Sequence, residues 1–146
     1  MSSRIFVDSS VLIEPVRNEK VEFYKELVTN SNNICCINSI VVSEYLYKYI
    51  GLKGIGSPRA IKERNEIADA LYPYFTTNIL KEFLFIETSS SIVNLVPGLM
   101  ATYNLLPNDA IIIATCKIHG INHLASYDSD YKTVCRAEGI TLLMEQ

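Results

Sequence analysis

The chain has 146 residues, of which 49% are hydrophobic and 20% are charged, and its formal net charge is -3 at pH 7. A chain of this length can bury one hydrophobic core, so we expect residues 1–146 to form a single domain. The longest apolar runs, such as residues 110–114, are far shorter than the roughly 20 residues that cross a bilayer, which argues against a membrane protein. The N-terminal MSSRIF passes straight into an apolar run without a signal-peptide pattern, so we expect a cytoplasmic protein.

The first half of the chain alternates strand and helix patterns. An unbroken apolar run that ends in an acid predicts a strand over residues 4–8, covered on both faces. Residues 19–29 carry one apolar face and predict a helix. A strand over residues 33–38 follows, and Ser39 is predicted to be the N-cap of a helix over residues 39–50.

The second half continues the alternation after a Gly/Pro-rich break at residues 51–58. Prolines are predicted to open two of its helices, and a Pro-Gly pair at residues 97–98 is predicted to interrupt a third. The expected elements are helix 58–75, strand 83–87, helix 89–105, helix 108–119 after Pro107 and before Gly120, strand 123–127, helix 130–139 and strand 140–144.

This alternation predicts an α/β protein: a three-layer α/β/α sandwich around a mostly parallel central sheet of about five strands. The strand order does not follow from the pattern. The four cysteines lie in apolar segments without zinc-type spacing, so we expect buried free thiols: Cys35, Cys36, Cys116 and Cys135.

Four acids are candidates for a shared site at one edge of this sheet. Asp8 ends the first strand, and Asp128 directly follows the strand over residues 123–127. Asp109 lies in the first turn of the helix after Pro107, and Glu44 lies on a helix that is apolar around most of its circumference. Ligands of open α/β sheets bind beyond the carboxyl ends of the strands, where these acids are expected.

Each acid also has a structural explanation on its own, as a helix cap, a turn residue or a partner of a helix dipole. A cluster has a further consequence: at an effective dielectric constant of about 20, two unit charges ~4 Å apart repel by ~4 kcal/mol, so grouped carboxylates must bind protons or cations. Oxygen ligands without nearby Cys or His favour Mg²⁺ or Mn²⁺. These ions suit the hydrolysis of phosphodiester bonds.

The ordered motifs resemble those of the PIN-domain ribonucleases, in particular the VapC-like toxins of prokaryotic toxin–antitoxin systems. They are DSS at residues 8–10, the acid Glu44, NDAIIIATCKIHG at residues 108–120 and LASYDSDY at residues 124–131. The resemblance spans essentially the whole chain. It departs from the family pattern in a somewhat long stretch from Glu44 to the third motif, and in Tyr131, where the family commonly has Phe.

The resemblance implies endonucleolytic cleavage of RNA that depends on Mg²⁺ or Mn²⁺, with a metal-activated water as the nucleophile. It also implies a homodimer and a cognate antitoxin as partners. Four acids match the family's catalytic, metal-binding residues, and three hydroxyls and a further acid match groups that support them: Asp8, Glu44, Asp109 and Asp128, with Ser9, Ser10, Ser126 and Asp130 in support.

The negative net charge differs from the excess of basic residues that is typical of a nucleic-acid-binding protein. Without the four proposed ligands, however, 12 acids remain against 13 Lys and Arg. Basic residues gather around the break after the Glu44 helix, and we expect Lys48, Lys53 and Arg59 to contact RNA phosphates. Lys48 is the stronger candidate because it lies one helical turn beyond Glu44.

Two other functions fit the same residues. One is a PIN-type nuclease that processes RNA outside any toxin pair. The other is a catalytically silent PIN-like binding module, which the complete set of acids disfavours. The motif of a haloacid-dehalogenase phosphohydrolase is absent because position 10 is Ser, and no Walker A or Gly-rich dinucleotide loop is present.

Overall fold

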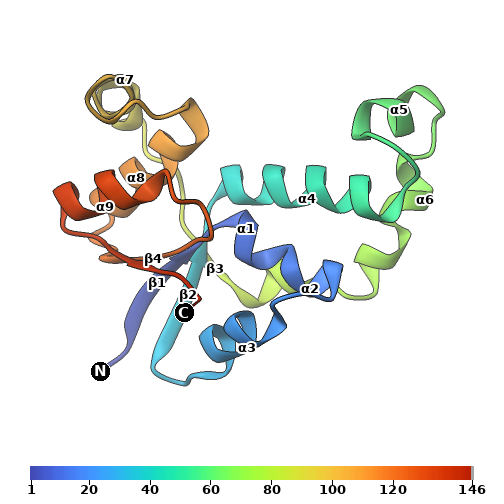
Figure 1. The fold of residues 1–146 in the computed structure, drawn as a ribbon, viewed down its shortest axis with the longest axis horizontal. Coiled ribbons are helices and arrows are strands. Elements are labelled where there is room, and N and C mark those ends of the chain that lie inside the picture. Colours follow the sequence, from blue (N-terminus) through green and yellow to red (C-terminus); the bar gives the residue numbers. More distant parts are fainter. Residues whose placement is uncertain (146) are drawn as a thin grey trace.

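A parallel sheet of five strands forms the centre of the molecule in the computed structural model, which describes residues 1–145 (Figure 1). The strands lie in the order β3-β2-β1-β4-β5, and each neighbouring pair is parallel. Apolar residues of the middle strand are buried, as expected for a strand covered on both faces. The strands are β1 (Ser3–Val7), β2 (Asn33–Ile37), β3 (Leu84–Phe85), β4 (His123–Ala125) and β5 (Thr141–Leu143).

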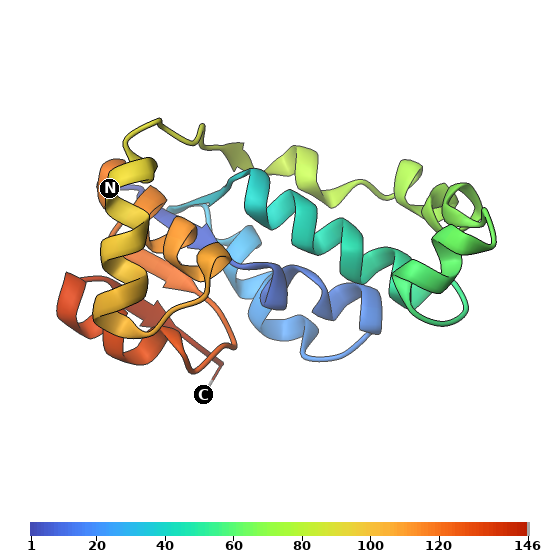
Figure 2. The same cartoon turned by 90° about the horizontal axis from the view of Figure 1, so that it is seen from above.

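Helices cover both faces of this sheet, which confirms the predicted three-layer α/β/α sandwich. In Figure 1, α8 and α9 lie on one side of the strands and α3 on the other. Figure 2 shows α4 extending away from the sheet toward α5 and α6. The helices are α1 (Ser9–Leu12), α2 (Glu14–Arg17), α3 (Val21–Thr29), α4 (Ser39–Lys53), α5 (Pro58–Glu63), α6 (Ile67–Leu71), α7 (Ile92–Tyr103), α8 (Pro107–Ile118) and α9 (Tyr131–Glu138), with 3₁₀ turns η1 (Tyr72–Phe75) and η2 (Ile79–Glu82).

The strand order reverses beside β1. The chain places β2 and β3 on one side of β1, then crosses back and places β4 and β5 on the other. The neighbours β1 and β4 end together, with Val7 opposite Ala125, and the Asp8 amide donates to the Ala125 carbonyl at 2.9 Å. In open α/β sheets such a reversal leaves a crevice at the carboxyl ends of the strands, where ligands bind.

The connection between β1 and β2 holds more helix than predicted. The short helices α1 and α2 precede α3, whereas the sequence pattern predicts a single helix starting at residue 19. The predicted cap of α4 is also wrong by one residue. Asn38 is the N-cap, because its side chain accepts a hydrogen bond from the Val41 amide, and Ser39 is the first helical residue.

The single helix predicted over residues 58–75 is wrong, because the chain forms α5, α6 and η1 there. Asn65, just after α5, has a left-handed backbone with φ of 60°. Asparagine tolerates this conformation, which no α-helix can continue through. The turn changes the direction of the chain, and the following helix α6 packs against α4.

The interruption predicted at Pro97 and Gly98 is also wrong, because α7 runs unbroken from Ile92 to Tyr103. A proline inside a helix leaves one carbonyl four residues earlier without its donor. That carbonyl belongs to Val93, which is 72% exposed, so water can replace the missing donor. Within residues 1–145 no helix is long and apolar enough to cross a membrane.

Candidate active site at the reversal of strand order

Asp8 lies directly after β1 and is the N-cap of α1. Its backbone is extended, and Oδ2 accepts hydrogen bonds from the Ser10 amide at 3.3 Å and from the Ser10 hydroxyl at 2.7 Å. Ser126, which follows β4, donates its hydroxyl to the same oxygen at 3.0 Å. Two strand ends thus hold one buried carboxylate, and the bonds offset part of the cost of its burial.

Glu44 reaches the same region from the second turn of α4. Its Oε2 accepts the hydroxyl of Ser9 at 2.7 Å, and its Oε1 accepts the side-chain amide of Asn108 at 2.9 Å. Ser9 is fully buried in α1, and Asn108 belongs to the first turn of α8. Three separate elements therefore fix the position of the Glu44 carboxylate.

Asp109 lies next to Asn108 in the first turn of α8, which Pro107 opens as predicted. Its Oδ1 accepts a hydrogen bond from the hydroxyl of Tyr131 at 3.0 Å. Tyr131 is the first residue of α9 and is 1% exposed, so its hydroxyl has no access to bulk water. The packing of α9 against α8 therefore orients Asp109.

Asp128 lies in the turn between β4 and α9. Its backbone amide donates to the Ser126 hydroxyl at 3.0 Å, and its Oδ1 accepts the amide of Asp130 at 2.9 Å. Asp130 contributes this amide, while its exposed side chain makes no cap bond to α9. Ser126 thus joins Asp8 and Asp128, because it donates to one and accepts from the other.

The electrostatics of Asp109 indicate that the four acids share one region. Burial raises the pKa of the Asp109 carboxyl, and repulsion from Asp128, Asp8 and Glu44 raises it further, while the hydrogen bond from Tyr131 opposes the rise. All three other acids therefore act on Asp109 through space. The structure brings all four acids named from the sequence into this region, where the hydroxyls of Ser10 and Ser126 donate to Asp8 and that of Ser9 donates to Glu44.

The donor set of this region suits a hard divalent cation, because it consists of carboxylate and hydroxyl oxygens. Each of the three aspartates uses one carboxylate oxygen in the bonds above, and within residues 1–145 its other oxygen accepts no hydrogen bond from the protein. Over the same residues, no three His, Cys, Asp or Glu side chains lie close enough together to enclose an ion directly. Mg²⁺ commonly binds through one or two carboxylates and keeps several waters, so this arrangement fits it.

The three basic residues expected to contact RNA do not lie together. Lys48 lies inside the acidic region, where its ammonium donates to the Ser9 hydroxyl at 2.9 Å. Lys53, the last residue of α4, lies near the ring of Tyr49, with its ammonium 5.9 Å from the ring centroid. Arg59 lies on α5, where it pairs with Glu63 at 3.1 Å. The structure therefore places Lys48 at the acids and the other two along the arm formed by α4 and α5.

Two residues of this region were not named as site residues from the sequence. Asn108 contacts Glu44, and Tyr131 contacts Asp109. Both lie within the motifs quoted above, and that location was the signal that could have identified them. Their contacts could not be predicted from the sequence, because each joins the residue to a partner at least 22 positions away.

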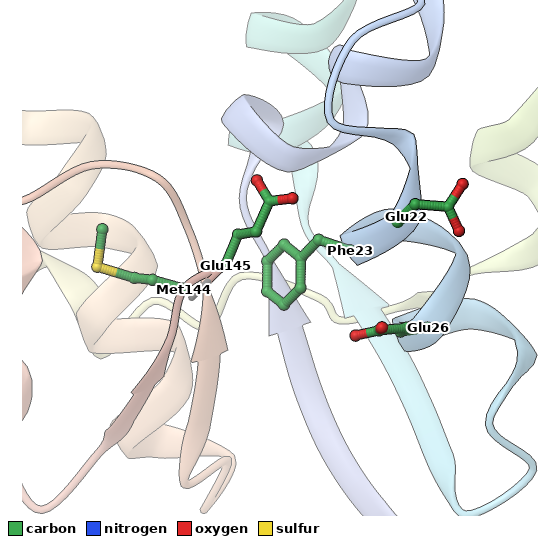
Figure 3. A pocket seen from close by; sticks show the side chains of 5 residues that line it. All are labelled: Glu22, Phe23, Glu26, Met144 and Glu145. Carbon is green, nitrogen blue, oxygen red and sulfur yellow. The ribbon is translucent and has the colours of Figure 1, made fainter.

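A hollow lies beside α3 and the C-terminal residues of the described chain (Figure 3). Figure 3 shows the ring of Phe23 between three glutamates, and the lining residues are Glu22, Phe23, Glu26, Met144 and Glu145. None of the four acids of the candidate site lines this hollow. The two sites are joined indirectly, because the hydroxyl of Tyr127 contacts Glu145 at 3.3 Å and the amide of Tyr127 contacts Ser10 at 3.1 Å.

Comparison with known proteins identifies the family of the chain. The PIN domain family model matches residues 5–137. Ribonuclease VapC6 of Methanocaldococcus jannaschii is 34% identical over 145 residues, which cover 90% of this chain and 93% of the relative. Ribonuclease VapC2 of the same organism is 36% identical over 134 residues, covering 90% and 89%. A toxin–antitoxin complex from Klebsiella pneumoniae contains a chain of the same fold, with a TM-score of 0.59, 21% identity, and coverage of 89% of this chain and 92% of that chain.

The five-stranded parallel sheet with helices on both faces defines an α/β protein of the three-layer class. More particularly, the chain belongs to the PIN-domain family, and this membership confirms the resemblance found in the sequence.

Proposed function

We propose that the protein is an endoribonuclease that depends on Mg²⁺ or Mn²⁺ and uses Asp8, Glu44, Asp109 and Asp128 as its catalytic acids. The observation that carries this proposal is the gathering of four carboxylates from four separate segments, close enough that the other three act on the charge of Asp109 and each held by hydrogen bonds from the surrounding protein. Such a concentration of negative charge is costly without a cation. The two relatives named ribonuclease add support from sequence.

One or two of the aspartates would hold the cation directly, through the carboxylate oxygens that no protein donor occupies, and the remaining acids would accept hydrogen bonds from the waters that the ion keeps. When bound, the ion supplies a Lewis acid for the phosphate and lowers the pKa of a coordinated water. The protein residues keep the acids in place: Ser10 and Ser126 fix Asp8, Ser9 and Asn108 fix Glu44, and Tyr131 fixes Asp109. In the reaction, a water gives up a proton to solvent and its oxygen bonds to phosphorus, the bond from phosphorus to the leaving oxygen breaks, and the leaving oxygen takes a proton from solvent.

The proposal is tested by measuring RNA cleavage with purified protein in Mg²⁺, in Mn²⁺ and in EDTA. We expect cleavage in either metal and none in EDTA. Asp8→Asn should reduce the rate at least ~100-fold, because typical electrostatic contributions at active sites are of this size. Asp69→Asn is the matched control, since it removes the same charge from an exposed position on α6.

Circular dichroism and thermal unfolding should show that both variants fold. If Asp8→Asn cleaves RNA as fast as Asp69→Asn, the proposed chemistry is wrong. If the wild-type protein binds RNA but cleaves none in either metal, the catalytically silent binding module becomes the better description.

We further propose that the nuclease is the toxin of a toxin–antitoxin pair and acts on RNA in the cytoplasm as a homodimer. The support comes from the two relatives named VapC and from the matching chain in a toxin–antitoxin complex. Expression with the product of a neighbouring small open reading frame should yield a stable complex in which cleavage is inhibited. Light scattering of the purified protein measures its molar mass and so tests for the dimer. A nuclease that binds no such product would instead fit an RNA-processing role.

A further inference from the structure

Lys48 occupies an unusual position for a basic side chain, because it lies among the acids without pairing with them. It lies one helical turn after Glu44 on α4 and is half-buried. Its ammonium donates to the hydroxyl of Ser9 at 2.9 Å, and that hydroxyl donates to Glu44 Oε2 at 2.7 Å. The lone pair of the serine oxygen thus faces the lysine, and its proton faces the glutamate.

The ammonium retains hydrogen-bonding capacity toward the site. A lysine ammonium has three N–H donors, and the bond to Ser9 uses one of them. In the described part of the chain Lys48 forms no ion pair, whereas Arg59, Arg64 and Lys117 each pair with a glutamate. Two donors and an unpaired positive charge are therefore available beside the carboxylates.

The position of this ammonium is set by the fold. Ser9 is fully buried in the first turn of α1, where Asp8 caps the helix. Glu44 and Lys48 face Ser9 from successive turns of α4, and α1 packs against α4. A flexible surface lysine would lose considerable side-chain entropy on binding a phosphate, whereas much of that loss already accompanies folding here.

A phosphodiester that approaches four carboxylates meets strong repulsion. Bound cations reduce this repulsion, and a fixed ammonium at the same place reduces it further. Lysine binds phosphate as a point charge and needs no particular orientation of the phosphate oxygens. The chemistry of the two remaining donors therefore suits a non-bridging phosphate oxygen.

We propose that Lys48 is a catalytic residue that donates a hydrogen bond to a non-bridging oxygen of the scissile phosphate and, through Ser9, holds the Glu44 carboxylate. This inference rests on the proposed nuclease function. It assigns Lys48 a role at the reacting phosphate itself, whereas Lys53 and Arg59 would contact only flanking phosphates. The competing explanation is that Lys48 merely balances the charge of Glu44 and supports folding.

The test compares Lys48→Met with Lys25→Met, which removes the same charge from an exposed position on α3. Three quantities are measured for each: kcat and KM for a single-stranded RNA in Mg²⁺, RNA affinity against salt concentration in the Asp8→Asn background, and Mn²⁺ affinity without RNA. Should Lys48→Met fail to fold, Lys48→Gln replaces it, because glutamine keeps a donor for Ser9 without the charge.

We expect the Lys48 variant to lower kcat by roughly 10- to 100-fold, in line with the loss of one hydrogen bond to a charged group. The salt dependence of RNA binding should fall by about one phosphate contact. Mn²⁺ affinity should be equal or higher, because a positive charge beside the metal site has been removed. Lys25→Met should resemble the wild-type protein in all three.

Two results would overturn the assignment. Cleavage by the Lys48 variant at the rate of Lys25→Met excludes a catalytic role, and a loss of Mn²⁺ affinity in parallel with activity shows that Lys48 only supports the metal site. Both require an active wild-type protein. A wild-type protein that cleaves no RNA contradicts the nuclease function itself, so the two failures are distinguishable.

Discussion

Tyr131 brings a hydroxyl group to Asp109 at a position where the family commonly has Phe. Tyr131 is buried at the start of α9, and its hydroxyl donates to Asp109 Oδ1 on α8 at 3.0 Å. This bond stabilises the ionised carboxylate and so lowers its pKa, against the effects of burial and of the neighbouring acids. A single oxygen atom thus orients an acid and favours its charged form.

Tyr131→Phe should raise the pKa of Asp109 further, because the opposing hydrogen bond is lost. We expect RNA cleavage to fall by roughly 3- to 10-fold at neutral pH, the equivalent of one ordinary hydrogen bond. Carboxyl-carbon NMR titration of the metal-free protein measures the pKa, and initial rates measure the activity. An Asp109 pKa that does not move, or moves downward, would show that the hydroxyl does not stabilise the carboxylate in solution.

At the scale of elements, α7 illustrates how far local propensity yields to packing. The helix continues through Pro97 and Gly98, although both residues disfavour helix. Its buried Leu99 and its packing on α8 hold the segment in place. Tertiary packing therefore offsets the unfavourable helix propensity of these two residues.

Gly98→Ala should stabilise the protein by about 0.5–1 kcal/mol, because a Cβ there meets no atom within 4 Å and alanine favours helix. Gly139→Ala is the contrasting variant. Gly139 ends α9 with φ of +70°, a conformation that strains other residues, so we expect a destabilisation of about 1 kcal/mol. Urea unfolding of both variants measures the two effects, and an equal change in both would contradict this account.

At the scale of the whole molecule, four carboxylates from distant segments meet only when the chain is folded. Asp109 has its ordinary pKa of 3.8 in the unfolded chain and a raised pKa in the folded protein. The folded state therefore binds this proton more tightly, and its stability falls as the pH rises from below 3.8 through the raised pKa. Above that range, the ionised carboxylate costs stability until a cation compensates it.

Mg²⁺ should accordingly raise the Tm of the protein at pH 7 and raise it less near pH 4, where protons compete for the carboxylates. A ligand at 100 times its Kd that binds only the folded state contributes about 2.7 kcal/mol. Asp109→Asn should raise the Tm in EDTA at pH 7 and lose most of the gain with Mg²⁺. Differential scanning fluorimetry in EDTA and in Mg²⁺ measures both, and an equal Mg²⁺ shift in the variant and the wild type would contradict the expectation.

The sequence by itself determined the local elements and their chemistry. The apolar run before Asp8, Pro107 at the start of α8 and Gly120 after its end act within a few residues, so pattern and propensity suffice to predict them. The same patterns predicted that acids follow two parallel strands. The prediction of one helix over residues 58–75 was wrong because an asparagine with a left-handed backbone follows α5. The periodicity of apolar residues does not reveal such a backbone conformation.

Only the tertiary structure decided which side chains meet. The strand order places β4 beside β1, and this pairing brings Ser126 to Asp8 across 118 positions of the chain. The packing of α1 against α4 brings Ser9 to Glu44 and Lys48. Such contacts depend on the burial of many residues at once and on the rotamers that remain available in the packed core, and no single stretch of sequence contains that information.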